Sequence, residues 1–384
     1  MKLVKFNYAQ HLGEPQEWKL VDCTFGDINL IVGKNATGKT RTLNVIRALA
    51  DLLSELTELK WKEGIYEVEF EHNGQTIAYV LEYHHRAVTK ELLTINSDVR
   101  LTRGPGGEGE IYAADDIKKM IRFRVPENQV AAFAKRDSIQ HPFLEELYEW
   151  GKGVIRYDFG TLLGKDHFVV IKQAEEDDDA TLDLRQTQKV VAIFLDGLKK
   201  YSKDFSQAII EDLRDLGYDI EDIGVENVPD LSFQPNIGVN PSGIYVKEVD
   251  RNDKTFQPAM SQGMFRALSV LIQLNYLLLA GEPSCILIDD IGEGLDFGRS
   301  SALINTLINK IEGSSTQLIM ATNDRFVMNN VPLEYWIIIQ RQGSECIHYN
   351  YRNSKPMFDE FEMTGLSNFD LFSSNYYLRA KETP

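Results

Sequence analysis

Residues 30–43 of the chain read LIVGKNATGKTRTL, and this stretch decides the fold. Gly33, Gly38, Lys39 and Thr40 have the spacing G-x-x-x-x-G-K-[ST]. Glycines let a backbone wrap closely around phosphate groups, so that its N–H groups face the phosphate oxygens. A lysine in such a loop reaches the β- and γ-phosphates, and the hydroxyl that follows ligates Mg²⁺. The spacing therefore predicts a loop that binds ATP and Mg²⁺.

The sequence on either side supplies the strand and the helix that this loop needs. Apolar residues precede it within 28–32, and Leu43, Ile46 and Leu49 follow it at a helical period. A helix that starts at Lys39 directs the positive end of its dipole at the same phosphates. The predicted nucleotide-binding residues are Gly33, Lys34, Asn35, Ala36, Thr37, Gly38, Lys39, Thr40 and Arg41, and Thr40 is also a predicted metal ligand.

A second motif, CILIDD at 285–290, is an apolar run that ends in two acids. In P-loop proteins the carboxylate at the end of such a strand holds Mg²⁺, directly or through water. A neighbouring acid orients the attacking water. We therefore expect Asp289 to be a metal ligand and Asp290 to be the catalytic base.

A third motif, MSQGMFR at 260–266, opens a long apolar helix. The N-terminus of a helix presents free N–H groups, and small residues such as Ser261 and Gly263 let a phosphate approach them. The chain already has one phosphate-binding loop. A second phosphate-binding feature, at the start of this helix, is useful if it binds the nucleotide of another subunit. Ser261 and Gly263 are therefore predicted to bind that nucleotide.

Together the motifs resemble those of the ABC-class ATPases. The P-loop, S-x-G at 261–263, ILIDD at 286–290 and GLD at 294–296 stand in the order of that family. The form MSQGMFRALSVL resembles the soluble branch that contains SMC-like, RecF-like and OLD-type ATPases, and not the transporters. The resemblance covers about residues 1–60 and 255–345, and the middle of the chain matches only loosely.

The resemblance implies a head-to-tail homodimer with two ATP molecules sandwiched between the P-loop of one subunit and the signature helix of the other. Residues 294–296 match the D-loop, which crosses this interface. Arg266 matches a basic residue of the signature helix in the soluble branch. It either counters phosphate charge or pairs with an acid.

Two positions depart from the family pattern. Asp290 replaces the catalytic glutamate and is one methylene shorter, and Asn323 replaces the switch histidine. Asparagine hydrogen-bonds a phosphate but does not change charge near neutral pH. Glu293 is either an alternative acid that orients the water or simply a D-loop charge. The resemblance also implies a glutamine that ligates Mg²⁺, and Gln129 and Gln140 are both candidates.

Composition indicates a globular cytoplasmic protein. Hydrophobic residues make up 43% of the chain, enough for a large core, and no stretch approaches the length of an apolar membrane span. We therefore expect no membrane association. Three scattered cysteines indicate reduced thiols, with neither a zinc site nor a disulfide framework. His84 and His85 are adjacent, and on a strand they would face opposite ways, so we do not expect the pair to bind a metal.

The net charge of −17 disfavours non-specific binding to nucleic acid. One basic segment is an exception, and it is either a solvated face or a patch for nucleic acid or a partner. It contains Lys118, Lys119, Arg122, Arg124, Lys135 and Arg136. The aromatic C-terminal residues either dock a partner or pack on the protein. They are Phe358, Phe361, Phe369, Phe372, Tyr376 and Tyr377.

The predicted fold is α/β, an ABC-type P-loop ATPase head with a mixed sheet, an antiparallel β-subdomain and an inserted helical lobe. A hairpin turn is expected at Asn73-Gly74, a flexible connection at 102–110, a mobile acidic loop at 175–179, and two short amphipathic helices between about 190 and 217. The predicted divisions are 1–100 for the P-loop and β-subdomain, 101–255 for a mainly helical insertion, 256–350 for the second part of the head, and 351–384 for a tail.

The leading functional hypothesis is an ATP-driven dimeric switch that controls a partner effector. Soluble members of the family often act beside a separate nuclease or toxin, including in bacterial defence against phage. The alternative is a repair-type nucleic-acid clamp of the SMC-like or RecF-like kind. A small-molecule P-loop kinase is less favoured, because a kinase needs no signature helix.

Overall fold

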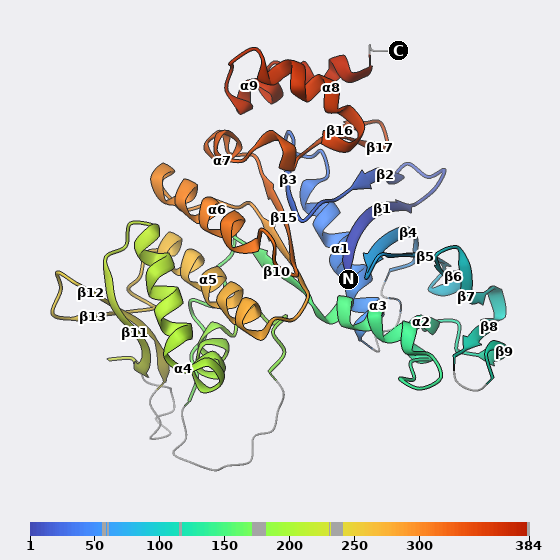
Figure 1. Cartoon of the computed structure of the whole chain (residues 1–384), viewed down its shortest axis with the longest axis horizontal. Coiled ribbons are helices and arrows are strands. Elements are labelled where there is room, and N and C mark those ends of the chain that lie inside the picture. Colours follow the sequence, from blue (N-terminus) through green and yellow to red (C-terminus); the bar gives the residue numbers. More distant parts are fainter. Residues whose placement is uncertain are drawn as a thin grey trace. The chain divides into compact units, whose positions relative to one another are not determined.

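The computed structural model describes residues 1–55, 59, 61–114, 117–170, 182–229, 231 and 241–381 (Figure 1). The predicted acidic loop at 175–179 lies outside these residues. The chain forms two compact units. Unit 1 comprises Met1–Val154, Pro283–Leu287 and Gln317–Pro384, and unit 2 comprises Ile155–Glu282 and Ile288–Thr316. Strands β10 (Val154–Asp158), β14 (Ser284–Asp289) and β15 (Thr316–Thr322) each pass from one unit to the other.

Unit 1 contains most of a mixed sheet, whose strand order is β10-β14-β15-β3-β16-β17-β2-β1-β4-β5-β6-β7-β8-β9. Its other strands are β1 (Lys2–Gln10), β2 (Trp18–Thr24), β3 (Ile28–Val32), β4 (Glu63–His72), β5 (Gln75–His84), β6 (Ala87–Ile95), β7 (Asp98–Arg103), β8 (Glu108–Ala113), β9 (Lys119–Arg124), β16 (Trp336–Gln342) and β17 (Glu345–Asn350). β3 is buried along its whole length and pairs in parallel with β15 and β16. The consecutive strands β2-β1-β4-β5-β6-β7-β8-β9 at one end of this order pair antiparallel, as predicted for the β-subdomain.

The helices of unit 1 are α1 (Lys39–Ser54), α2 (Ala131–Ala134), α3 (Pro142–Lys152), α7 (Arg325–Asn330), α8 (Tyr351–Glu362) and α9 (Asn368–Ser373). Short 3-10 turns are η1 (Pro105–Gly107), η2 (Leu333–Tyr335) and η3 (Tyr376–Lys381). Leu43, Ile46 and Leu49 of α1 belong to the same buried core as the sheet residues Tyr8 and Trp18. The predicted helical period therefore marks the face of α1 that is buried.

Turn chemistry explains one correct prediction and one wrong one. Asn73 and Gly74 join β4 to β5 with φ values of 50° and 73°, as a type I′ hairpin turn requires. The expected flexible connection at 102–110 is instead a packed turn between β7 and β8. Gly107 has a φ of 80° there, and a Cβ atom on it would lie 2.2 Å from the carbonyl oxygen of Val125. The glycines here mark a tight turn between two strands, not a flexible connection.

Unit 2 contains α4 (Val190–Asp215), α5 (Gln262–Ala280), α6 (Phe297–Ile311) and a sheet of β11 (Ile220–Asn227), β12 (Ser242–Glu248) and β13 (Lys254–Phe256). Ser202 interrupts α4 with φ 54° and ψ −133°, so this segment is two short helices, as predicted. Among the described residues only α5 is long and apolar enough to span a membrane, and 83% of that stretch is buried inside the protein. Such burial is typical of a core helix.

The predicted divisions differ from these compact units. β8 and β9 extend the antiparallel sheet to Arg124, so the region expected to be a mainly helical insertion begins with strands. The expected second part of the head is itself divided, because α5 and α6 belong to unit 2 and β16 and β17 to unit 1. In the C-terminal tail, Phe358, Phe361, Phe372 and Tyr377 are buried, which supports packing over docking for these four.

Candidate functional site

The loop between β3 and α1 is shaped by glycines that have no room for a side chain. A Cβ atom on Gly33 would lie 2.6 Å from Cγ2 of Ile339 and 2.7 Å from Oγ1 of Thr37. Gly38 forms the N-cap of α1 with a φ of 113°, and Ala36 also has a positive φ, 63°. Residues with positive φ turn successive backbone N–H groups toward one side, which forms a concave anion site.

Lys39 lies inside this loop. Its Nζ donates hydrogen bonds to the carbonyl oxygens of Gly33 (2.8 Å) and Lys34 (3.2 Å), and the residue is only 8% exposed. Thr37 Oγ1 also donates to the carbonyl of Lys34, at 2.8 Å. Thr40, the predicted metal ligand, is exposed at the first turn of α1. The loop thus holds its own positive charge and leaves a hydroxyl open to a ligand.

Two side chains that the motif does not contain support the loop. The thiol of Cys346 donates to the carbonyl oxygen of Thr37 (3.1 Å), and Trp18 Nε1 donates to Sγ of Cys346 (3.0 Å). Burial raises the pKa of Cys346, which keeps the thiol protonated and able to donate. The guanidinium of Arg41 lies 4.3 Å from the centre of the Trp18 ring. Trp18 belongs to β2, and Cys346 belongs to β17, which is 309 residues from Thr37. No local pattern indicates these supports.

A cavity of about 350 Å³ adjoins the loop in unit 1. It is lined by Lys34, Thr37, Ile339, Gln340, Arg341, Asn375, Tyr377 and Leu378. Its volume lies at the lower end of the range for small-ligand pockets. The C-terminal segment therefore forms part of the surroundings of the P-loop.

The structure brings Asn323 to the P-loop. Asn323 follows β15, and β15 pairs in parallel with β3, with Thr322 opposite Val32. The P-loop and Asn323 consequently leave the same edge of the sheet. The Nδ2 group of Asn323 donates to Oδ1 of Asn35 at 3.2 Å. Two predicted site residues that are 288 positions apart are in direct contact.

In unit 2 the first acid of the CILIDD motif belongs to a cluster. Asp289 is 5% exposed, and its Oδ2 lies 3.4 Å from Nη2 of Arg156. The same Nη2 donates to Oδ1 of Asp158 at 2.6 Å. Arg156 and Asp158 alternate along β10, so both point to the face opposite Tyr157. Neither residue is among the predicted site residues, although the alternation in GVIRYDFG is a signal for them.

Asp290 begins a tight turn with a φ of 51°, a conformation that aspartate tolerates better than most residues. Its carbonyl accepts the N–H of Glu293 at 3.1 Å, so both candidate water-orienting acids belong to one turn. Asp290 is partly buried and Glu293 is exposed.

Ser261 and Gly263 have structural roles within their own unit. Ser261 is the N-cap of α5, and its Oγ accepts the N–H of Met264 at 3.1 Å. A Cβ atom on Gly263 would lie 2.2 Å from the carbonyl oxygen of Gly294. The signature helix and the D-loop are therefore packed backbone to backbone. From the sequence, these small residues are attributed to the approach of a phosphate, but the approach of this carbonyl also requires a glycine at position 263.

Arg266 ties these segments together. Its Nη1 donates to the carbonyl oxygen of Glu293 (2.8 Å) and its Nη2 to that of Thr161 (3.3 Å). Arg266 is 6% exposed; burial lowers its pKa, and the nearby charge of Glu293 opposes that shift. From the sequence, Arg266 either counters phosphate charge or pairs with an acid. In the structure it has a third role, because its hydrogen bonds go to backbone carbonyls.

The remaining predicted residues lie in other surroundings. The carbonyl of Gln129 accepts a hydrogen bond from Arg103, and the N–H of Gln140 donates to Asp137. Within the described part of the chain, neither glutamine side chain hydrogen-bonds to loop residues 33–40. Arg136 is engaged with Glu145 and with the ring of Tyr148. It is not part of a free basic patch.

Comparison with solved structures shows that this fold is similar to that of SMC head domains. An SMC head bound to the C-terminal winged-helix domain of ScpA is similar over 93% of this chain and 100% of its own, with a TM-score of 0.54 and 12% identity. The SMC head domain of Thermotoga maritima covers 91% and 99%, with a TM-score of 0.46 and 14% identity. An SMC head from Pyrococcus furiosus with an extended coiled coil, bound to the C-terminal domain of ScpA, covers 94% and 99%, with a TM-score of 0.48 and 11% identity.

No protein-family profile matches the sequence, and no curated protein shows significant sequence similarity to it. At this level of identity the structural likeness establishes the fold and leaves the activity to the site itself. The mixed sheet, the antiparallel β-subdomain and the helices agree with the predicted architecture. The chain has the α/β fold of an ABC-type SMC head domain.

Proposed function

We propose that this protein is an ABC-class ATPase that closes as a homodimer over ATP and Mg²⁺ and acts as a switch. The observation that carries the proposal is the P-loop itself. Lys39 lies inside a positive-φ loop between a buried strand and a helix, and Asn323 contacts Asn35 of that loop. Chance placement of a G-x-x-x-x-G-K-T sequence would not produce this combination.

The loop residues bind and orient the nucleotide. Lys39 exchanges its hydrogen bonds with the loop carbonyls for charge-assisted bonds to the β- and γ-phosphates. The N–H groups of 33–40 bind phosphate oxygens, and Asn323 holds the γ-phosphate through its amide. The fold supports this assignment, since the chain has the fold of an SMC head and its motifs resemble those of the ABC-class ATPases.

The acidic residues of unit 2 fit a divalent cation. Asp289 and Asp158 both contact the guanidinium group of Arg156. Mg²⁺ would bind their carboxylate oxygens in place of that contact, with Arg156 displaced. In this proposal Asp158 has the ligand role that the resemblance implies for Gln129 or Gln140. When bound, Mg²⁺ neutralises charge on the phosphates during transfer. Asp290 accepts a proton from the attacking water, and Glu293 is the alternative acid.

The dimer would use the rigid surface of α5 and the D-loop. Ser261, Gly263 and residues 294–296 would face the nucleotide of the second subunit, while Arg266 fixes their relative positions. A partner protein would then read the closed or open state. One solved SMC head is bound to a winged-helix domain of ScpA, which supports a protein partner. An effector such as a nuclease or toxin in antiviral defence remains our preferred class.

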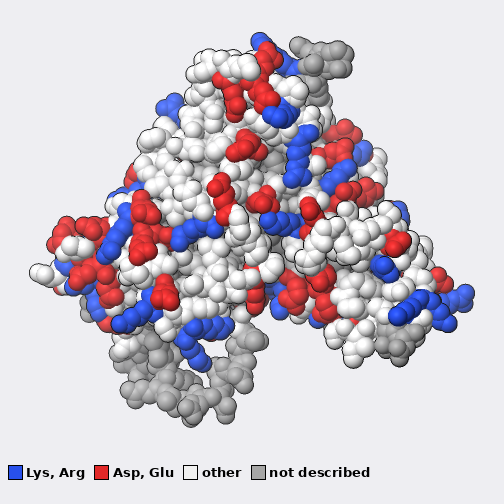
Figure 2. Space-filling model, viewed as in Figure 1, with Lys and Arg blue, Asp and Glu red and all other residues white. Residues whose placement is uncertain are grey.

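A nucleic-acid clamp is the second candidate, because one end of the sheet is basic. Lys119, Arg122 and Arg124 lie on the edge strand β9, and the side chain of Arg122 is 92% exposed. Figure 2 shows basic side chains gathered near this end of the sheet. Binding of duplex DNA that weakens steeply with salt and is lost in Arg122→Glu would favour the clamp.

The test of the first proposal is equilibrium binding of ATP to Lys39→Ala. Charge-assisted contacts to phosphate are worth about 1.5–3 kcal/mol, so affinity should fall by about ten- to a hundredfold while the fold survives. Lys203→Ala, at an exposed lysine of α4, is the matched control and should bind normally. Unchanged binding by a folded Lys39→Ala protein would refute the P-loop assignment.

A further inference from the structure

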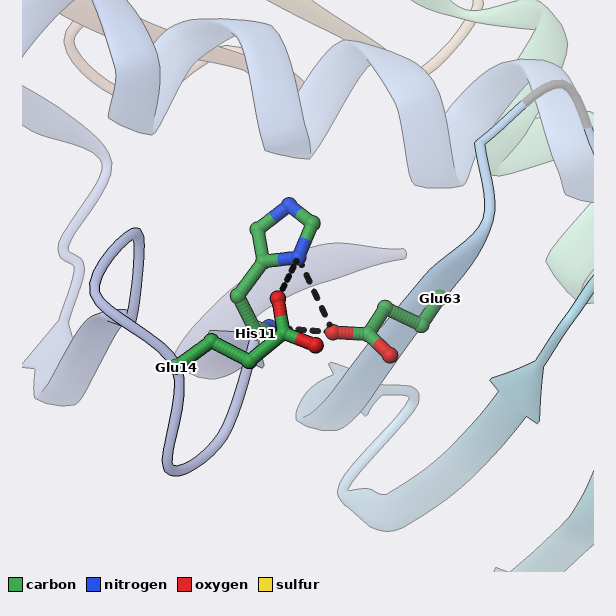
Figure 3. A group of neighbouring side chains, drawn as sticks. All are labelled: His11, Glu14 and Glu63. Carbon is green, nitrogen blue, oxygen red and sulfur yellow. Dashed lines mark hydrogen bonds and ion pairs between the residues drawn. The ribbon is translucent and has the colours of Figure 1, made fainter.

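We infer that the loop between β1 and β2 contains a binding site for a transition-metal ion, best suited to Zn²⁺, with His11, Glu14 and Glu63 as ligands. His11 and Glu14 lie in the loop after β1, and Glu63 is the first residue of β4. All three belong to unit 1, and none is part of the proposed nucleotide site. Figure 3 shows the three groups converging. One ligand atom from each lies within 4.8 Å of the others.

The distances match the spacing of metal ligands. Nδ1 of His11 lies 3.1 Å from Oε1 of Glu63 and 3.4 Å from Oε2 of Glu14. In a tetrahedral Zn²⁺ site with bonds of about 2.1 Å, neighbouring ligand atoms are separated by about 3.4 Å. A metal ion can therefore enter between these groups with small side-chain movements, replacing their contacts with one another.

The backbone conformation at His11 holds this residue close to Glu14 and Glu63. His11 has a φ of 54°, in the left-handed region that few residues with side chains occupy. Its N–H donates to Oε1 of Glu63 at 2.6 Å, and its carbonyl accepts the N–H of Glu14 at 2.9 Å. The tight turn thus holds all three residues together before any ion binds, which lowers the ordering cost of binding.

A fourth residue orients the central carboxylate. Nδ1 of His84 lies 2.8 Å from Oε2 of Glu63, the oxygen that faces away from His11. Hydrogen bonds of this kind hold metal-ligating carboxylates in place. The side chain of Glu63 is 17% exposed, whereas that of Glu14 is 58% exposed. The site is therefore anchored on its inner side and open to water for the remaining coordination position.

The ligand set selects the metal. One imidazole and two carboxylates suit borderline cations such as Zn²⁺, whereas Ca²⁺ and Mg²⁺ prefer oxygen ligands alone. We expected no zinc site because the cysteines are scattered, but that argument addressed thiolate sites only. We also expected His84 and His85 to face opposite ways. Their rings instead lie 4.1 Å apart, because His85 has a φ of 49° and starts a turn.

The proposed metal site is connected to the P-loop through Trp18. The loop that holds His11 and Glu14 ends at Trp18, whose indole is hydrogen-bonded to Cys346 beneath the P-loop. A bound ion would restrict the conformations of this loop. We therefore expect Zn²⁺ to stabilise unit 1 in the neighbourhood of β2.

Titration of the metal-free full chain with Zn²⁺ tests the site. The protein should carry no histidine tag, and excess Mg²⁺ should be present to occupy the proposed nucleotide-metal site. We expect saturable binding with a stoichiometry near one, a raised Tm, and X-ray absorption that shows nitrogen and oxygen ligands without sulfur. His11→Ala and Glu14→Gln should each weaken binding by about tenfold or more.

His72→Ala is the matched control. His72 Nε2 lies 2.8 Å from Glu146 Oε2, an equally close imidazole–carboxylate contact outside the group of potential ligands. This variant should bind Zn²⁺ like the wild type. Glu14 is exposed, so Glu14→Gln keeps the test valid even if His11→Ala fails to fold. Absence of saturable binding, or affinity unchanged in both folded site variants, would overturn the inference.

Discussion

Unit 1 and unit 2 each place a glycine-containing turn before a helix, and the two turns are built differently. In unit 1 the N-cap of α1 is Gly38, which provides no side-chain hydrogen bond, and Lys39 supplies charge to the loop. In unit 2 the N-caps of α5 and α6 are Ser261 and Asp296, each bonded to its own helix. Arg266 is similarly bonded to backbone carbonyls.

In the proposed dimer, this difference would give the two halves of the ATP site different roles. The unit 1 loop has uncapped N–H groups and a lysine whose partners are exchangeable, so it is suited to binding a free nucleotide. The unit 2 turn is already fixed by caps and by Arg266, so it is suited to recognising a nucleotide held by another subunit. Preorganised surfaces of this kind lose less entropy on association.

The largest effect on stability in this comparison is expected where an added methyl group meets backbone at the start of α5. Gly263→Ala places Cβ 2.2 Å from the Gly294 carbonyl, where backbone must move. Gly33→Ala meets mainly side-chain ends, Ile339 Cγ2 at 2.6 Å and Thr37 Oγ1 at 2.7 Å. Overpacking costs about 1–3 kcal/mol, and Gly263→Ala should lie at or above the upper end. The free energy of unfolding of both variants can be measured in denaturant. A larger loss of stability in Gly33→Ala than in Gly263→Ala would contradict this prediction.

Hydrolysis should be slow, because Asp290 reaches the attacking water with a short side chain. A misplacement of about 1 Å can cost about a hundredfold in rate. We predict steady-state phosphate release well below one per second, with a higher rate in Asp290→Glu. A protein that turns over many ATP molecules per second would contradict this expectation, and unchanged activity in Asp290→Asn would show that another acid, such as Glu293, orients the water.

A smaller effect is expected at the cap of α6. Hydrogen bonds from the backbone N–H of Arg299 lower the pKa of Asp296 below its usual value. A carboxyl group whose folded pKa is lowered stabilises the fold above its unfolded pKa of about 3.9 and loses that contribution as pH falls through the folded pKa. Asp296→Ala should cost about 1 kcal/mol at neutral pH, and Asp296→Asn much less.

Measurement of unfolding free energy from pH 7 down to pH 2 checks this prediction. The difference between wild type and Asp296→Ala should shrink at the acidic end, because the wild-type carboxyl is then protonated. A difference that stays constant over the whole range would show that the charge of Asp296 plays no part in the cap.

The sequence predicted the parts of the site that depend on local patterns. The P-loop, the apolar strand before Asp289 and the start of α5 each follow from spacing within a short window. Asn323 is predicted through the resemblance alone, and the structure shows it hydrogen-bonded to Asn35 of the P-loop. The roles of Arg266 and Gly263 were missed, because both depend on how the D-loop packs against α5. Arg156 and Asp158 were missed because their partner Asp289 is more than a hundred residues away.

Long-range packing also explains the errors in organisation. The turn at 102–110 looked mobile because glycine is common in both flexible loops and tight turns, and only the carbonyl of Val125 distinguishes the two. The His11 site escaped notice because Glu63 lies 52 residues from His11 and meets it only when β1 and β4 pair. Pairing between distant strands cannot be read from a short window of sequence.

The most direct test of the central claim, an ATP site shared between two subunits, is a mixture of two inactive variants. Lys39→Ala removes the charge of the P-loop, and Ser261→Arg places a bulky side chain at the start of α5. Each alone should lack ATPase activity. In a mixed dimer one of the two sites keeps both halves intact, so equal mixing should restore about a quarter of the wild-type rate. Absence of recovery, with mixed dimers shown to form, would contradict the shared site.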